Sequence, residues 1–154
     1  MKVLIITLLS LSTTFAFGQF QSTWVGGTPG KENVWNEARN WNTNRVPDAN
    51  THVLIKKHNS GHFAQPIVRD VVEVASIEMG PGSTLKVEAY GEINIDGENI
   101  YTQGIINKKG QIINNGIITM INIDAEYDTI ISKSIAGSGL LMIDGTSIAI
   151  AKVD

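Results

Sequence analysis

The sequence predicts an all-β protein built as a β-solenoid, and two observations lead to this fold class. Glycines recur every six or seven residues between Gly91 and Gly116, with couplets of isoleucine between them. This pattern gives very short β-branched strands joined by residues that tolerate left-handed backbone. A longer period lies above it, because Gly91 and Gly110 are nineteen residues apart, as are Gly97 and Gly116. About twenty residues fit one coil of a three-sided β-helix.

An antiparallel β-sandwich is the alternative architecture, since its turns also recur every ~8–12 residues. The short strands and frequent turns of this sequence favour the solenoid. So does the isoleucine-rich, aromatic-poor composition, which suits stacks of like side chains on neighbouring coils.

The first eighteen residues have the organisation of a secretory signal peptide. Lys2 precedes the apolar run Val3–Leu11, and small residues at Ala16 and Gly18 stand before a cleavage at Gln19. The apolar run is too short to span a membrane. The sequence therefore predicts a secreted or cell-surface protein that does not span the membrane.

Composition excludes several classes of function. The formal net charge is −3 and no basic stripe is present, so we expect no nucleic-acid partner. The chain has no cysteine, which rules out disulfides, thiol chemistry and thiolate metal sites. We expect no cofactor.

Residues 19–50 differ from the rest of the chain, because they contain all three tryptophans, Trp24, Trp35 and Trp41. Two interpretations are open. Either the indoles cover the open first coil of a stacked structure, as the cap of a repeat array does, or they form an exposed carbohydrate-binding platform. Within this segment, Asn33–Asn42 has the spacing for one helical turn.

Residues 51–154 are expected to form roughly four to five coils of the solenoid. Strands are predicted at Thr51–Lys56, Pro66–Val68, Val74–Met79 and Thr84–Ala89, and after the glycine-rich region at Thr129–Ile131, Gly139–Ile143 and Ser147–Val153. Polar residues predict a loop at Lys57–Gln65, and Gly80–Ser83 predicts a turn.

Two groups of side chains are candidates for a metal site. Asp124, Glu126 and Asp128 alternate, so their carboxylates share one strand face, and Ca²⁺ takes oxygen ligands of this kind. Solvated carboxylates on a strand are the simpler interpretation. His58 and His62 have H-x-x-x-H spacing, but Ser60-Gly61 between them favours a loop, so no metal site is predicted there.

Catalysis is not expected. In polysaccharide lyases a basic residue removes a proton beside a neutralised uronate carboxylate, and Lys108-Lys109 is the one conspicuous basic pair. It lies in a predicted turn with no acidic cluster near it in sequence. The sequence contains no Gly-x-Ser-x-Gly motif and no P-loop.

Several short motifs resemble the N-terminal region of large secreted surface proteins of Bacteroidetes-type bacteria. They are Thr23–Gly27, Trp35-Asn36, Asn40-Trp41, Val46-Pro47, Val53–Ile55, Gln65–Val68, Ala75–Glu78, Gly82–Val87 and Asn114–Ile118. The resemblance covers roughly residues 24–119. It implies a right-handed parallel β-helix of the adhesin-like kind and carries no catalytic residue across.

The function expected from the sequence is that of a non-catalytic, secreted or cell-surface structural or adhesive module. The alternative is a carbohydrate-binding module or a fragment of a polysaccharide-lyase-like β-helix. Cell-surface glycans and other surface proteins are the expected partners. The last segment, Ile148–Val153, has no proline or polar cap, so we also expect end-to-end self-association through the C-terminal coil.

Overall fold

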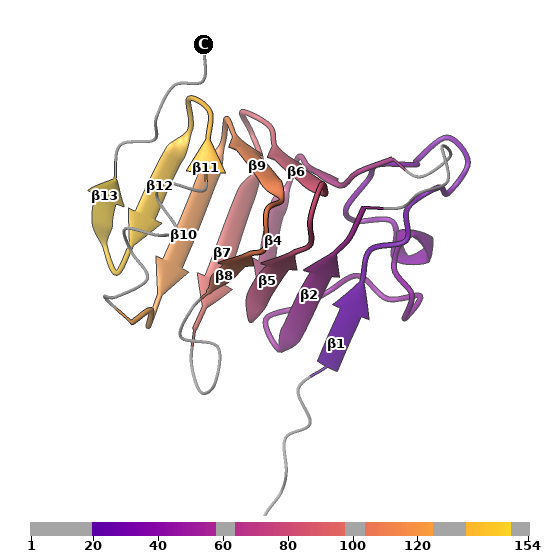
Figure 1. Ribbon diagram of the computed structural model, residues 1–154, viewed down its shortest axis with the longest axis horizontal. Coiled ribbons are helices and arrows are strands. Elements are labelled where there is room, and N and C mark those ends of the chain that lie inside the picture. The colour runs from indigo at the N-terminus through magenta and orange to yellow at the C-terminus, as the bar shows by residue number, and fades with distance from the viewer. Residues whose placement is uncertain (1–19, 58–63, 98–103, 125–134, 149–154) are drawn as a thin grey trace, which may run out of the picture.

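The structure is a computed structural model that describes residues 20–57, 64–97, 104–124 and 135–148 (Figure 1). Within these ranges the chain is all-β, apart from the single-turn 3-10 helix η1, Ala38–Asn40. This turn falls inside the segment for which one helical turn is expected. The predicted signal peptide, residues 1–18, lies outside the described residues.

The strands form three sheets. Sheet 1 contains β1 (Phe20–Thr23), β2 (Thr51–Ile55), β5 (Ser76–Met79) and β8 (Ile105–Asn107). Sheet 2 contains β3 (Ile67–Val68), β6 (Thr84–Val87), β9 (Gln111–Asn114) and β11 (Ile135–Ala136). Sheet 3 contains β4 (Val71–Val74), β7 (Glu92–Asp96), β10 (Ile117–Ile121), β12 (Leu140–Ile143) and β13 (Thr146–Ile148).

Neighbouring strands pair in parallel, except for β12 and β13. From β2 to β10 the chain visits sheets 1, 2 and 3 in rotation, so each strand pairs with the strand three places further along the chain. Pairing of this kind does not fit the antiparallel sandwich, whose strands would pair in opposite directions.

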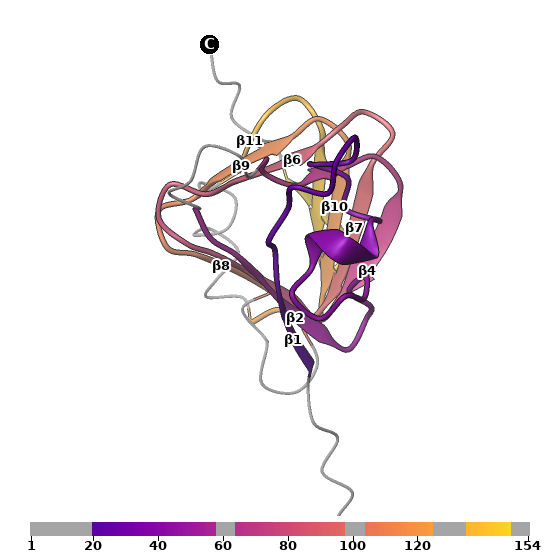
Figure 2. The ribbon, with the colours of Figure 1, turned by 90° about the vertical axis from the view of Figure 1, so that its right-hand side faces the viewer.

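The three sheets surround a common core (Figure 2). Alternate residues of each strand point inward, and parallel register places like side chains on top of one another. The stacked columns are Val53/Ile77/Ile105 in sheet 1, Leu85/Ile112/Ile135 in sheet 2 and Val72/Ile93/Ile118/Leu141 in sheet 3. The isoleucine couplets of the sequence therefore supply much of the core.

The glycines that approach one another are not the pairs that lie nineteen residues apart in the sequence. A Cβ on Gly116 would overlap the backbone oxygen of Gly91, and one on Gly139 would overlap that of Gly116. Glycines therefore stack at intervals of twenty-five and twenty-three residues. Between parallel strands, the sequence separation of register partners ranges from nineteen residues, as for Val68 and Val87, to thirty-one, as for Phe20 and Thr51. Strand pairing fixes the register, whereas the length of each corner varies.

Two predicted strands differ in their limits. Val74–Met79 is divided at Ala75, so that β4 belongs to sheet 3 and β5 to sheet 1. β13 begins one residue before the last predicted strand, Ser147–Val153, and overlaps only its start. It turns back antiparallel on β12 through Asp144 and Gly145, whose φ values are 45° and 79°. Consecutive positive φ values are typical of a type I′ hairpin turn. Residues 149–154 lie outside the described residues, and self-association through the C-terminal coil remains a prediction.

Candidate functional site

The three tryptophans form one buried cluster at the β1 end of the sheets. Trp24, Trp35 and Trp41 are at most 1% exposed, and Trp41 meets the other two edge to face at centroid distances of 5.0 and 4.7 Å. Trp41 Nε1 donates to the carbonyl of Trp35 at 2.8 Å, and Trp24 Nε1 donates to Ala64 O at 2.8 Å. A stacking platform needs exposed ring faces. The indoles are instead buried at this end of the core, which favours the cap interpretation of residues 19–50.

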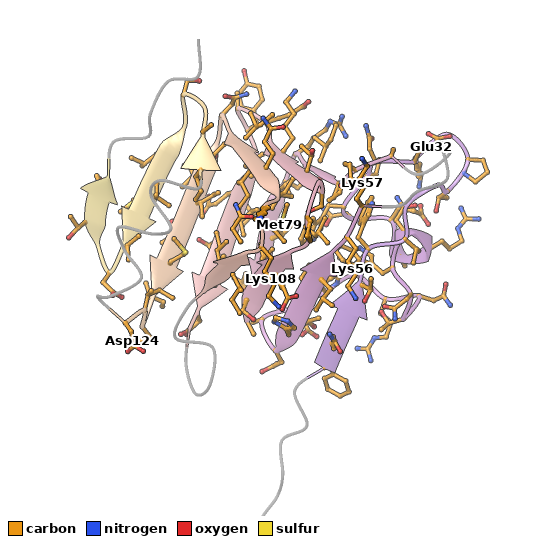
Figure 3. The ribbon with its side chains drawn as sticks, in the orientation of Figure 1. Glu32, Lys56, Lys57, Met79, Lys108 and Asp124 are labelled. Carbon is orange, nitrogen blue, oxygen red and sulfur yellow. The ribbon has the colours of Figure 1, made fainter. Side chains whose placement is uncertain are left out.

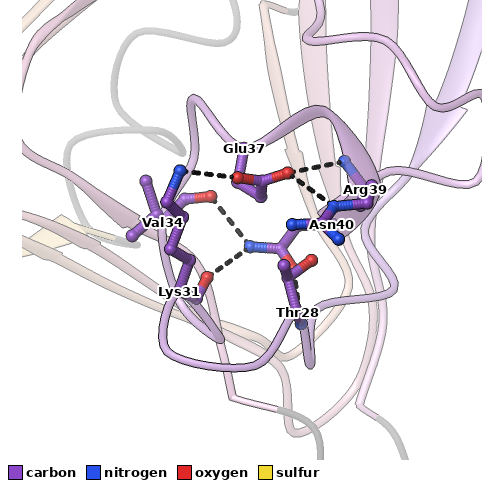
Figure 4. Close-up of polar contacts among 6 residues, drawn as sticks. All are labelled: Thr28, Lys31, Val34, Glu37, Arg39 and Asn40. Carbon is purple, nitrogen blue, oxygen red and sulfur yellow. Dashed lines mark hydrogen bonds and ion pairs between the residues drawn. The ribbon is translucent and has the colours of Figure 1, made fainter.

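Asn40 links several backbone segments of the tryptophan-containing region through hydrogen bonds (Figure 4). Its side chain is fully buried and makes three hydrogen bonds. Nδ2 donates to the carbonyls of Lys31 at 2.7 Å and Val34 at 3.0 Å, and Oδ1 accepts from the backbone N–H of Thr28 at 3.0 Å. Its own carbonyl accepts from the backbone N–H of Val25 at 2.9 Å. One amide thus satisfies the backbone of a segment that has little regular structure.

Replacing Asn40 with alanine should destabilise the protein by about 3 kcal/mol, because the three backbone groups that its buried side chain satisfies lose their partner. The unfolding midpoint in urea measures this loss. Asn36→Ala is the matched control, since Asn36 is exposed and its Nδ2 donates to Asp70 at the surface. Equal losses in the two variants would show that Asn40 has no special role.

Glu37 fixes the outer side of the same cap. Its carboxylate accepts from Lys31 Nζ at 3.0 Å and from Arg39 Nε at 3.1 Å. Hydrogen bonds from Lys31 and then Arg39 lower the pKa of Glu37 from 4.5 to about 2. Since the folded-state pKa is depressed, the stability that Glu37 contributes is present above pH 4.5 and is lost as the pH falls towards 2.

His52 lies on the outer face of sheet 1 and is nevertheless only 8% exposed. Its Nδ1 lies 2.6 Å from Ser76 Oγ. Burial lowers the pKa of His52 below 6.5, Lys108 lowers it further, and Glu78 opposes the shift. The neutral imidazole is therefore the form that the fold favours.

We expect the protein to lose stability as the pH falls below about 6.5, because the unfolded chain then binds a proton that folded His52 resists. Unfolding midpoints at about pH 7.5 and 5.5 measure the effect. In His52→Gln this part of the fall should be missing. A variant that loses as much stability as the parent over this range would remove His52 as its cause.

The predicted calcium ligands are not brought together in the described residues. Asp124 is exposed, and Glu126 and Asp128 lie outside the described ranges, as do His58 and His62. Within the described ranges no three acidic or histidine side chains are placed to hold a metal ion.

Asn122 links two neighbouring acidic side chains instead. Its Nδ2 donates to Asp96 Oδ1 at 2.8 Å, and its backbone N–H donates to Asp144 Oδ1 at 2.7 Å. Asn122 has a φ of 57°, so it occupies a corner that requires left-handed backbone. These carboxylates serve the turn between sheet 3 and the next segment.

A hollow of about 280 Å³ lies over the outer face of sheet 3. It is lined by Ala49, Glu73, Val74, Asn94, Ile95, Asp96, Thr119 and Ile121. Glu73, Asn94 and Thr119 are register partners on three adjacent strands, so they form a row. This row can donate and accept hydrogen bonds, but it contains no nucleophile paired with a base.

Lys108, of the basic pair that suggested a lyase, is held by an ion pair. Its Nζ lies 2.9 Å from Glu78 Oε1, at the surface beside sheet 1. The amine that a lyase would use as its base is therefore already engaged by a carboxylate of the same protein.

Sequence reasoning missed the role of Asn40, although its position directly before a tryptophan in an asparagine-rich segment was a usable signal.

Comparisons with family models, with curated proteins and with solved structures returned no match. No helix in the described part of the chain has the length and apolar character needed to cross a membrane.

Proposed function

We propose that this protein is a non-catalytic β-solenoid scaffold that acts outside the cell as a structural or adhesive module. One observation carries the proposal: parallel strands visit three sheets in rotation, with like side chains stacked around one core. A fold built from such layers gains stability by nearest-neighbour stacking and offers long, regular outer faces. Its working surface is then the sheet exterior rather than an enclosed pocket.

The handedness and the capping follow from the same proposal. Connections between parallel strands are right-handed in nearly all proteins, so we assign a right-handed β-helix. The buried tryptophans close the end next to β1, where a repeat array needs a distinct covering. The resemblance of residues 24–119 to N-terminal regions of secreted Bacteroidetes-type surface proteins supports the same architecture.

Export is tested by producing the full chain in a bacterial host that has a general secretion pathway. The proposal predicts that the exported protein begins at Gln19, as measured by intact mass. Protein that stays in the cytoplasm with residues 1–18 still attached would contradict export.

The non-catalytic, adhesive role is tested with the purified protein on a glycan array and on soluble polysaccharides. We expect binding without release of reducing ends or unsaturated products. Tryptophan emission should be blue-shifted and unchanged by ligand, since the indoles are buried. Turnover of any polysaccharide would contradict the proposal, and so would the absence of binding to every glycan and to intact bacterial cells.

A further inference from the structure

The strand register brings two lysine pairs to one corner of the fold. Ile55 pairs with Met79, and Met79 pairs with Asn107, at the ends of β2, β5 and β8. The residues that follow these strands are Lys56-Lys57, Gly80-Pro81 and Lys108-Lys109, so they form three layers at the corner between sheets 1 and 2. Figure 3 labels Lys56, Lys57 and Lys108 around Met79. These four lysines, Lys56, Lys57, Lys108 and Lys109, are called the lysine corner below.

The middle layer of the corner carries no charged side chain. Gly80 donates its N–H to Ile55 O, and Lys108 donates its N–H to Met79 O, which locks the three layers together at 2.8 Å for both bonds. A Cβ on Gly82 would lie 3.0 Å from Lys57 Cδ. The stem of Lys57 therefore packs over the glycine turn. A cationic pair thus lies on each side of an uncharged turn.

Most of the positive charge of the lysine corner is not neutralised. All four lysines are exposed, and Glu78 pairs with Lys108 alone. No carboxylate of the described residues forms an ion pair with the other three. In contrast, the outer face of sheet 3, across the core, carries Glu73, Glu92 and Asp96. A chain of net charge −3 thus keeps a basic corner apart from an acidic face.

We propose that the lysine corner binds an acidic polysaccharide whose carboxylates bridge the two lysine pairs. The pairs are two strand spacings apart, roughly 9–10 Å, so they match a polyanion with sparse charges. Duplex DNA carries one charge per ~1.7 Å and is repelled by the acidic face. The corner also lacks aromatic side chains among its described residues, and single-stranded nucleic acid needs such side chains for stacking. The inference rests on the stacked register and not on the adhesive role.

Polygalacturonate is the probe, with neutral dextran and duplex DNA as comparisons. At low ionic strength the purified protein should bind polygalacturonate, and added salt should weaken the binding. The triple variant Lys56→Gln/Lys57→Gln/Lys109→Gln should bind at least about tenfold more weakly. Arg45→Gln is the control, because Arg45 is an exposed cation in the cap, away from the corner.

Each remaining outcome overturns the proposal. Polygalacturonate binding that the triple variant retains would place the site elsewhere, and absence of binding by the parent protein would remove it. DNA binding as tight as polygalacturonate binding would make the corner a nucleic-acid surface. An equal loss in Arg45→Gln would reduce the effect to net charge. Circular dichroism of the variants shows whether a loss of binding comes from misfolding. Binding to neutral glycans does not depend on the lysine corner, so the proposed adhesive role would stand even if polygalacturonate did not bind.

Discussion

Gly116→Ala should destabilise the protein by about 3 kcal/mol or more, one of the two largest losses expected of a single substitution. An added Cβ would overlap the backbone oxygens of Gly91 and Glu88 and would lie 3.0 Å from Val87 Cγ1. Backbone atoms of a neighbouring layer cannot move aside as a flexible side chain can. The loss is measured as a lower urea midpoint with an unchanged slope.

Gly80→Ala is the matched control for this substitution. Gly80 also lies at a corner, but its nearest contact to an added Cβ is Ile55 O at 3.4 Å, an ordinary van der Waals distance. We expect its stability to change by less than about 1 kcal/mol. If Gly116→Ala were as stable as Gly80→Ala, the close approach of Gly116 to Gly91 would be wrong.

Trp41→Ala should cost about 3–5 kcal/mol, because it removes a large side chain that is 1% exposed and leaves a cavity at the end of the core. It also removes both edge-to-face contacts, with Trp24 and with Trp35. Near-ultraviolet circular dichroism should lose the signal of the packed indoles, and the thermal midpoint should fall.

Tyr90→Ala is the control for the loss of an aromatic ring, since Tyr90 is 92% exposed. It should leave the midpoint nearly unchanged. A Trp41→Ala variant as stable as Tyr90→Ala would contradict the cap. If the variant were also unable to bind a glycan that the parent binds, the platform interpretation would replace it.

The sequence pattern predicted the all-β class because short β-branched strands and frequent turn residues are local features. Alternation in Thr84–Ala89 and the couplet Ile117-Ile118 correspond to β6 and β10. Periodicity alone could not predict which glycines stack, since the corner lengths vary. Gly91 and Gly110 have the expected spacing, yet Gly91 approaches Gly116.

The tryptophans show a different limit of sequence reasoning. Composition separated residues 19–50 from the rest, but burial depends on what packs against each ring. The side chain of Asn40 adds three hydrogen bonds to the backbone of this segment, besides those that Trp24 and Trp41 donate. The lysine corner was also hidden in the sequence, because Lys57 and Lys109 are brought to one edge only by the pairing of β2, β5 and β8.

Paired cysteines can report whether the parallel layers are stacked in this register, because the chain has no cysteine of its own. Asn94 and Thr119 are register partners on β7 and β10, so their Cα atoms should be about 4.8 Å apart, within disulfide range. Asn94→Cys/Thr119→Cys should form an intramolecular cross-link under mild oxidation. Asn94→Cys/Ile113→Cys, nineteen residues apart and on different sheets, should not. The reverse result would contradict the register, and with it the stacked fold.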